Sequence, residues 1–274
     1  MANRRDYTTL GHSRLNAPER LGACESAFRS LGIAPRRVLD VGGTGGSAAW
    51  LRDVFPEAEI AVLNNSPFEN DALPPGVGFV LGDAQAIPTG ERYDMVYAGE
   101  VIEHLWNPDG FLDSASAVVA DHGWLIVTTP NLACLANRLF LLFGWTPGNI
   151  SPSIRYITGN PVLPEGTGEI GTIAHHKSVF TLGGFRRLAE LYGFQLRRLR
   201  GFSYAPEPGQ KRWGLGGREV QSSGYGLRRT MNSVLPHSLR EGMALLFEHR
   251  PETRKAAELV YPPDVTLPVF QKVV

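Results

Sequence analysis

Apolar residues recur along the chain at two spacings, and each spacing predicts one kind of secondary structure. The segment 17–31 shows the helical spacing. Leu21, Cys24 and Phe28 follow one another there at intervals of three and four, which places them on one face of an amphipathic helix. Gly32 suits the end of that helix, because glycine readily adopts the left-handed conformation that closes many helices.

Short apolar runs predict buried strands, and these runs alternate with helical segments along the chain. Seven strands are expected, over residues 37–41, 60–63, 77–81, 95–98, 124–129, 194–199 and 243–248. Further helices are expected over residues 47–54, 109–120, 132–143, 181–192 and 227–235. Because parallel neighbours need crossover connections, the alternation predicts an α/β fold with a doubly wound, mostly parallel seven-stranded sheet.

The alternation is interrupted after the fifth strand. Residues 144–173 are rich in Gly, Pro and Ser and show little periodicity. A loop of that length is more often a lid or binding loop than a passive connection. We therefore expect one main domain over residues 35–250 with a lid insertion at about 142–180. An N-terminal helical cover (residues 1–34) precedes this domain, and a C-terminal tail (residues 251–274) follows it.

The composition narrows the class of partner. The 274 residues include 27 basic and 27 acidic side chains, so the formal net charge is zero, which argues against nucleic acid as a partner. Cys24 and Cys134 are isolated and predict neither a disulfide nor a cysteine metal site. The most apolar stretch, residues 132–145, is shorter than the ~20 residues that span a bilayer. We expect no transmembrane segment and a cytoplasmic protein.

A glycine-rich loop follows the first strand. The strand ends with Asp40 and Val41, and the next residues are Gly-Gly-Thr-Gly-Gly at positions 42–46. Glycines permit positive φ and let main-chain atoms approach a ligand closely. No Lys-Ser/Thr pair follows, which excludes a phosphate P-loop, and the spacing differs from that of a dinucleotide fingerprint.

Two further polar residues stand where strands end. Asn64 follows the second strand, and Asp83 follows the third within the sequence GDAQAIP. Ligands of doubly wound sheets bind beyond the carboxyl ends of the strands, so both residues belong to the same expected site as the glycine loop. Each also has a purely structural alternative, because Asn64 can open a turn and Asp83 can cap a helix.

These segments together resemble the class I S-adenosylmethionine-dependent methyltransferases. Residues 38–46 read VLDVGGTGG where the family has VLDVGxGxG, with Thr44 in place of the middle glycine. Residues 82–88 resemble the family's GDAxxLP segment. The resemblance covers roughly residues 35–130, and it implies a Rossmann-like fold that binds S-adenosylmethionine.

The resemblance also implies roles for single residues. Asn64 stands where the family has a carboxylate for the ribose hydroxyls, and its amide keeps one acceptor and one donor. Asp83 would hold the adenine amino group, and the backbone N–H of Ala84 would meet the ring. Contact with the methionine and ribose parts of the cofactor is implied for Asp40, Gly42, Gly43, Thr44 and Gly46.

The fourth strand runs into the sequence EVIEHL at residues 100–105, a combination that recurs in class I methyltransferases, including those of ubiquinone biosynthesis. The resemblance places Glu100 beside the cofactor sulfur. A helical turn that begins at Glu100 would put Glu103 and His104 three and four residues further on, so that all three side chains share one face.

Two interpretations of these side chains stay open. In the first, which we favour, no metal is used, and His176, His175 or His104 takes the proton from a hydroxyl nucleophile. In the second, Glu100, Glu103 and His104 hold a divalent ion together with His176 or His175. That set, with TTPN at residues 128–131, resembles the small-RNA 3′-terminal 2′-O-methyltransferases.

The expected acceptor is a small molecule or a sugar hydroxyl of a natural-product or glycan pathway. Side chains that could contact it by stacking or charge are Tyr7, Trp145, Arg155 and Tyr156. A different hypothesis is a non-catalytic, cofactor-binding partner subunit, because Thr44 and Asn64 depart from the family pattern. A homodimer is left open.

Overall fold

The computed structural model describes residues 18–66, 73–150, 158–160, 176–204 and 233–255. It contains the seven expected strands, each within a few residues of the predicted bounds. They are β1 (Arg37–Val41), β2 (Glu59–Asn64), β3 (Gly78–Leu81), β4 (Tyr93–Gly99), β5 (Val119–Pro130), β6 (Phe194–Phe202) and β7 (Gly242–His249). The helices are α1 (Pro18–Leu31), α2 (Gly45–Val54), α3 (Pro108–Val118), α4 (Leu135–Leu142) and α5 (Leu182–Leu191).

All seven strands form one sheet in the order β3-β2-β1-β4-β5-β7-β6. The first five pair in parallel, whereas β7 is antiparallel to both β5 and β6. The chain therefore winds outwards from β1 in one direction and from β4 in the other. The carboxyl ends of β1 and β4 flank the point where the winding reverses, which is where sheets of this kind bind ligands.

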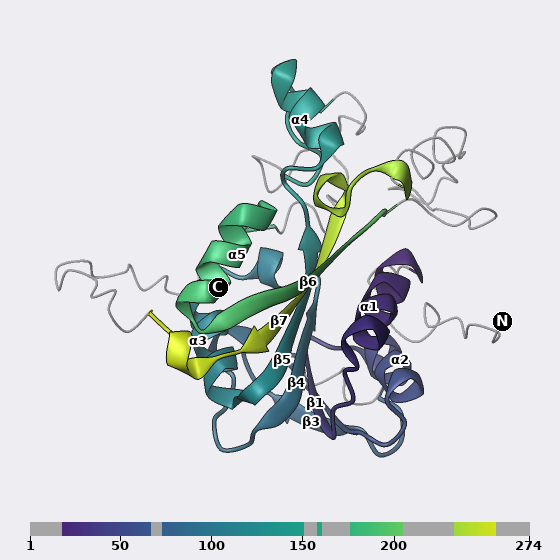
Figure 1. The fold of residues 1–274 in the computed structure, drawn as a ribbon, viewed down its shortest axis with the longest axis vertical. Helices are drawn as coiled ribbons and strands as arrows, with labels where there is room; N and C mark the ends of the chain where they lie inside the picture. The colour runs from purple at the N-terminus through teal and green to yellow at the C-terminus, as the bar shows by residue number, and fades with distance from the viewer. Residues whose placement is uncertain (1–17, 67–72, 151–157, 161–175, 205–232, 256–274) are drawn as a thin grey trace.

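Helices cover both faces of the sheet, so the expected doubly wound α/β fold is confirmed (Figure 1). On one face, Phe28 of α1 and Trp50 of α2 are buried in a core that includes Met95 of β4. On the other face, Phe111 of α3 and Phe185 of α5 are buried in a second core. The alternating apolar residues of the strands divide between these two cores.

Two predicted helices differ from the observed ones at their ends. The helix expected over residues 109–120 ends at Val118, and β5 begins directly after it. The helix expected from residue 132 begins at Leu135, because Asn131 forms a turn in which its side-chain carbonyl accepts the Ala133 N–H at 3.0 Å. The helix expected over residues 227–235 falls largely outside the described residues.

No helix among the described residues is both long enough and apolar enough to cross a membrane. The helix α4, which follows β5, stands clear of the sheet at one end of the molecule (Figure 1).

Candidate functional site

The loop after β1 has a backbone that only glycines accommodate at two positions. Gly42 has a φ of +67°, and a Cβ atom there would lie 2.6 Å from Cγ2 of Val101. A Cβ atom on Gly43 would lie 2.2 Å from a carboxylate oxygen of Asp40. The loop is held in place by a hydrogen bond of 2.7 Å from the Gly42 N–H to the Leu63 carbonyl of β2. The main chain of the loop therefore forms a cradle at the carboxyl end of β1.

Asp40 lies beneath this cradle and is fully buried. The Ser47 hydroxyl of α2 donates a hydrogen bond of 2.6 Å to its carboxylate. Burial raises the pKa of Asp40 to about 7, because the charged form loses its hydration. Ser47 also accepts the Thr44 N–H at 2.8 Å, which joins the loop to the first turn of α2.

The residue that leaves β4, Glu100, takes an unusual backbone conformation. Its φ is +59°, a left-handed value that non-glycine residues seldom adopt, and its N–H donates to the Thr128 carbonyl of β5 at 2.9 Å. Strained backbone of this kind is common at functional sites. The buried Glu100 carboxylate then points toward α1 and the end of β6.

Two residues that sequence patterns did not single out meet Glu100 there. The Tyr204 hydroxyl, just after β6, donates to one carboxylate oxygen at 2.6 Å, and the Arg20 guanidinium of α1 lies 3.9 Å from the other. Burial, followed by the charge of Glu100, raises the pKa of Tyr204. Arg20 adjoins the apolar stripe of its helix and Tyr204 follows an edge strand, so nothing in the local sequence marks either residue as part of the site.

Buried oxygen atoms without a hydrogen-bond partner gather at this edge of the sheet. Among the described residues they belong to Thr44, Tyr97, Glu100, Glu103 and Thr128. A buried polar atom that lacks a partner costs ~1–3 kcal/mol, and folded proteins rarely retain several in one place without a use for them. Together with the glycine cradle, they make this edge of the sheet the candidate site for a polar ligand.

Asn64 and Asp83 both make the local contacts that purely structural roles require, a turn for Asn64 and a helix cap for Asp83. The Asn64 side-chain amide donates to the Gly43 carbonyl at 2.9 Å, and its carbonyl accepts the Ser66 N–H at 3.0 Å, as in a turn. Asp83 is exposed and caps the short 3₁₀ turn Ala84–Ala86 by accepting the Gln85 N–H at 2.8 Å. The cofactor contacts expected for Asn64, Asp83 and Ala84 stay predictions.

A second group of side chains lies beyond Glu100. Glu103, His104 and His176 each offer one ligand atom, and these atoms lie within 4.8 Å of one another. The two imidazole rings are 4.9 Å apart between centroids, and one nearly faces the edge of the other. We call these three residues the acceptor-side cluster.

Neighbouring groups fix the orientation of this cluster. The Thr129 hydroxyl donates to one oxygen of the buried Glu103 carboxylate at 3.0 Å, and burial raises the pKa of Glu103 well above its ordinary value. Nδ1 of His176 lies 2.9 Å from the Asn149 carbonyl. A carbonyl can only accept, so Nδ1 carries the proton and Nε2 keeps its lone pair when the ring is neutral.

The expectation of one helical turn from Glu100 through His104 is wrong. Because Glu100 is left-handed, the turn begins two residues later as a 3₁₀ turn over Ile102–His104. The Glu100 carboxylate therefore faces Arg20 and Tyr204. Among the described residues, Glu100 is not part of the acceptor-side cluster that could hold a metal ion.

The residues expected to contact the acceptor are only partly within the described chain. Tyr7, Arg155, Tyr156 and His175 lie outside the described residues. The ring of Trp145 packs against Phe143 and Phe140 of the α4 region, with centroids 5.2 and 6.2 Å away. Its role toward an acceptor stays a prediction.

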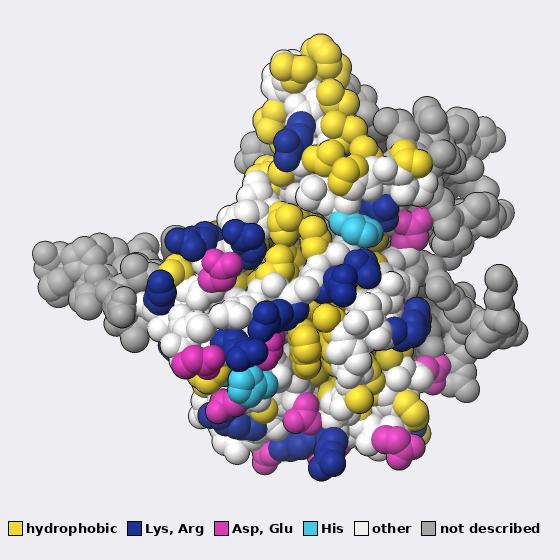
Figure 2. All heavy atoms as spheres, viewed as in Figure 1, with side chains coloured by type: hydrophobic (Ala, Val, Ile, Leu, Met, Phe, Trp, Pro, Cys, Tyr) yellow, Lys and Arg dark blue, Asp and Glu magenta, His cyan; other side chains and the backbone are white. Residues whose placement is uncertain are grey.

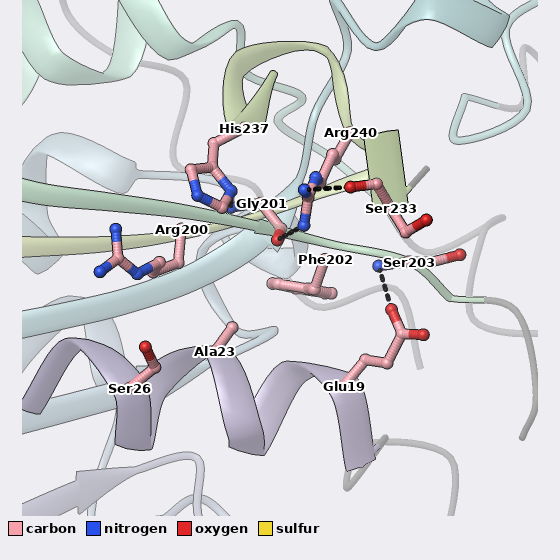
Figure 3. Close-up of a pocket in the computed structure, with 10 residues that line it drawn as sticks. All are labelled: Glu19, Ala23, Ser26, Arg200, Gly201, Phe202, Ser203, Ser233, His237 and Arg240. Carbon is pink, nitrogen blue, oxygen red and sulfur yellow. Dashed lines mark hydrogen bonds between the residues drawn. The ribbon is translucent and has the colours of Figure 1, made fainter. Parts of the chain in front are cut away.

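A cavity of about 620 Å³, larger than the space at the glycine cradle, opens between α1 and β6 (Figure 3). Its polar groups are largely engaged within the protein. The Arg240 guanidinium donates to the carbonyls of Gly201, Ser233 and Leu235, and Nδ1 of His237 accepts the Gly201 N–H at 3.0 Å. The buried oxygens without a hydrogen-bond partner lie elsewhere, around the glycine cradle, so the cradle and not this cavity is the candidate ligand site.

Comparison with known proteins gives a consistent result. A family model described as a methyltransferase domain matches residues 17–199. Trans-aconitate 2-methyltransferase of Methylobacterium radiotolerans is 35% identical over 141 residues, which are 49% of this chain and 54% of that protein. Malonyl-[acyl-carrier protein] O-methyltransferase of Methylococcus capsulatus is 31% identical over 119 residues, 40% of this chain and 43% of that protein. The chain thus spans about half the length of these relatives.

Solved structures agree on the fold. An S-adenosylmethionine-dependent methyltransferase of Thermotoga maritima superposes with a TM-score of 0.52 at 14% identity, over 84% of this chain and 89% of that one. The plantazolicin methyltransferase BpumL, solved with a substrate analogue and S-adenosylhomocysteine, gives 0.53 at 12% identity, over 89% and 90%.

Proposed function

The chain belongs to the methyltransferase domain family, in its class I, S-adenosylmethionine-dependent form, and we propose that it methylates an oxygen atom of a small-molecule acceptor. The observation that carries this proposal is the position of the acceptor-side cluster. Its residues Glu103 and His104 follow the end of β4, at the edge of the sheet that bears the glycine cradle. One of the two curated relatives carries the term O-methyltransferase in its name, which supports oxygen as the nucleophile.

The residues around the cradle fit the expected cofactor. Gly42 and Gly43 leave room for close approach of a ligand, and the unpartnered oxygens of Thr44 and Glu100 offer hydrogen-bond positions within it. Bound S-adenosylmethionine would supply a methyl group on a sulfonium that carries its own leaving group. The buried carboxylate of Glu100, which Tyr204 and Arg20 hold in place, offers a hydrogen-bond acceptor to the ligand at this point.

The protein then has two tasks toward the acceptor. It must hold the nucleophilic oxygen in line with the methyl group, and it must accept the proton of a hydroxyl nucleophile. His176 suits the second task, because the Asn149 carbonyl holds its Nδ1 proton and leaves Nε2 as a base. His104 lies beside it and is the second candidate.

Cofactor binding is tested by titration calorimetry with S-adenosylhomocysteine, followed by turnover of methyl-labelled S-adenosylmethionine with a panel of hydroxy and carboxylic acids. We expect binding and transfer of label to oxygen. Folded protein that binds neither S-adenosylmethionine nor S-adenosylhomocysteine would refute the proposal. Binding without turnover of any acceptor, together with a co-purifying subunit, would favour the non-catalytic alternative.

The proposed base is tested by His176→Gln, with His237→Gln as a matched control, because His237 lies in the larger cavity away from the acceptor-side cluster. We expect kcat to fall ~10²–10⁴-fold for His176→Gln while the affinity for S-adenosylhomocysteine stays unchanged. The control should keep its activity. Full activity in His176→Gln would exclude this residue as the base.

A metal-assisted reaction is the second candidate, and a specific observation favours it. Two imidazoles and one carboxylate within 4.8 Å of one another form a ligand set suited to divalent transition metals such as Mn²⁺. Glu103 has a buried oxygen without a hydrogen-bond partner, while Thr129 and the Asn149 carbonyl orient Glu103 and His176 from behind. In this candidate the cluster would act as ligands toward a sugar or RNA 2′-hydroxyl.

The two candidates differ in their response to chelation. The metal-assisted reaction predicts that EDTA abolishes turnover, that Mn²⁺ or Mg²⁺ restores it, and that Glu103→Gln loses calorimetric Mn²⁺ binding but still binds S-adenosylhomocysteine. Turnover that resists EDTA would rule this candidate out and leave the histidine base.

A further inference from the structure

The exposed large apolar side chains of the described residues are unevenly distributed. Five of the eight lie at the end of α4 and in the turn after it. We call them the α4 tip: Leu139, Leu141, Leu142, Phe143 and Trp145, between 42% and 75% exposed. Figure 2 shows apolar side chains covering the end of the molecule where α4 stands in Figure 1.

The α4 tip is a built structure. Gly144, with a φ of +73°, ends the helix, and the Trp145 N–H donates back to the Phe140 carbonyl at 2.8 Å. The Trp145 ring then packs on Phe143 with centroids 5.2 Å apart. Its apolar side chains are therefore held outward in a fixed arrangement.

The base of α4 is equally fixed. Asn137 is buried, and its amide donates to the Leu132 carbonyl at 3.0 Å and to the Asn149 side chain at 2.8 Å. The Asn149 carbonyl in turn faces Nδ1 of His176. A short chain of contacts thus joins α4 to the acceptor-side cluster.

The exposed residues surround the tip. Leu141, Leu142 and Phe143 are consecutive, and successive helical residues point about 100° apart, so they project to three sides. Leu139, Leu142 and Phe143 follow the spacings of three and four that a helix bound in a protein groove requires. Leu141, however, lies off that stripe and is 58% exposed. An apolar medium that encloses the tip matches the observed arrangement better.

The charge pattern points to the same kind of partner. Residues 123–154 contain one basic side chain, Arg138, and no acidic residue. Arg138 is exposed on the α4 turn before the tip, and its Nε donates to the Ala133 carbonyl at 2.7 Å, so its guanidinium lies on the base side of the tip. A cation and a tryptophan at the margin of an apolar segment are typical of segments that lie in the headgroup layer of a membrane.

We propose that the α4 tip inserts into the headgroup layer of a lipid surface. This is surface attachment by one turn of helix and its capping aromatic. The lipid surface would contact α4, and Asn137 and Asn149 connect this helix to the acceptor-side cluster.

The proposal is tested by flotation of the full chain with vesicles of phosphatidylcholine and phosphatidylglycerol. The test variant is Leu142→Glu with Phe143→Glu, and the matched control is Leu81→Glu, because Leu81 is a similarly exposed leucine at the end of β3. We expect the wild type and the control to float with the vesicles. The double variant should bind at least ~10-fold more weakly, since burying each such side chain contributes more than that factor.

Binding of S-adenosylhomocysteine and the thermal midpoint, measured for all three proteins, show whether each is folded, and vesicle binding needs no turnover. The proposal would be overturned by a wild type that does not float, or by equal flotation of wild type and double variant. Light scattering adds a third outcome. The wild type could be a dimer and the double variant a monomer, with neither binding vesicles. That result would make the tip a contact between two copies of the chain and would overturn the proposed lipid attachment.

Discussion

The backbone of Gly43 leaves no space for a side chain. A Cβ atom added to this residue would lie 2.2 Å from the Asp40 carboxylate. The carboxylate cannot move away easily, because Ser47 holds it from α2. We expect Gly43→Ala to lower the free energy of unfolding by about 1–3 kcal/mol and to weaken the binding of S-adenosylhomocysteine. Urea denaturation and titration calorimetry measure the two effects.

Gly183 provides the control for this substitution. It lies in α5, and a Cβ atom there would meet nothing within 4 Å. Gly183→Ala should therefore leave ligand binding unchanged and stabilise the protein by about 0.5–1 kcal/mol through helix propensity. Equal effects of the two substitutions would show that the cradle is looser than the contacts indicate.

Asp40 should make stability depend on pH. Burial raises its pKa to about 7, whereas in the unfolded chain the carboxyl group ionises near pH ~4. The folded state therefore keeps a proton that the unfolded state has released. Its contribution to the free energy of unfolding is full below pH ~4 and falls as the pH rises to about 7, by on the order of a few kcal/mol.

The measurement is urea denaturation of the wild type and of Asp40→Asn at several pH values between 4.5 and 8. The wild type should lose stability relative to Asp40→Asn as the pH rises through this range. Asp53→Asn, at an exposed position, should follow the wild type. A difference between wild type and Asp40→Asn that stays constant with pH would contradict the shifted pKa.

At the scale of elements, single capping residues decide where helices begin. The Thr181 hydroxyl accepts the Gly184 N–H at 3.1 Å at the start of α5, the helix that follows the acceptor-side cluster along the chain. Thr181→Ala should lower the free energy of unfolding by about 1 kcal/mol, because a first-turn N–H loses its partner. Thermal or urea unfolding measures the change.

Thr181→Ser serves as the matched variant, since it keeps the hydroxyl and should retain nearly all of the stability. The affinity for S-adenosylhomocysteine should not change in either protein, because α5 lies on the sheet face opposite α1 and α2. A loss of stability in the serine variant as large as in the alanine variant would rule out capping as the cause.

At the scale of the whole molecule, β7 holds the last part of the sheet together. It lies between β5 and β6 and is antiparallel to both, so a strand near the end of the chain completes the sheet. Leu246 is fully buried there and pairs across to Ile126 of β5. We expect Leu246→Ala to cost about 2–5 kcal/mol of unfolding free energy.

Leu81→Ala is the comparison for this substitution, because Leu81 is mostly exposed. It should change stability by less than ~0.5 kcal/mol. Denaturant unfolding of both variants would reveal a small cost for Leu246→Ala if β7 were only loosely packed against the sheet.

The local sequence determined the elements of this protein and the approximate site. Apolar periodicity depends on which side chains face a core, so the seven strands, most of the helices and the doubly wound class followed from it. The glycine loop and the EVIEHL segment predicted which edge of the sheet carries the candidate site, because strand ends in such a fold converge there.

Tertiary structure decided which side chains meet at that edge. Arg20, Glu100 and Tyr204 come from three distant parts of the chain, and their contact depends on how α1 and β6 pack beside β4. The left-handed conformation of Glu100 depends on its bond to Thr128 of the neighbouring strand. The Glu100 carboxylate meets Arg20 and Tyr204 instead of joining the acceptor-side cluster. Periodicity reports burial along one segment, whereas such contacts depend on packing between segments, which no local pattern encodes.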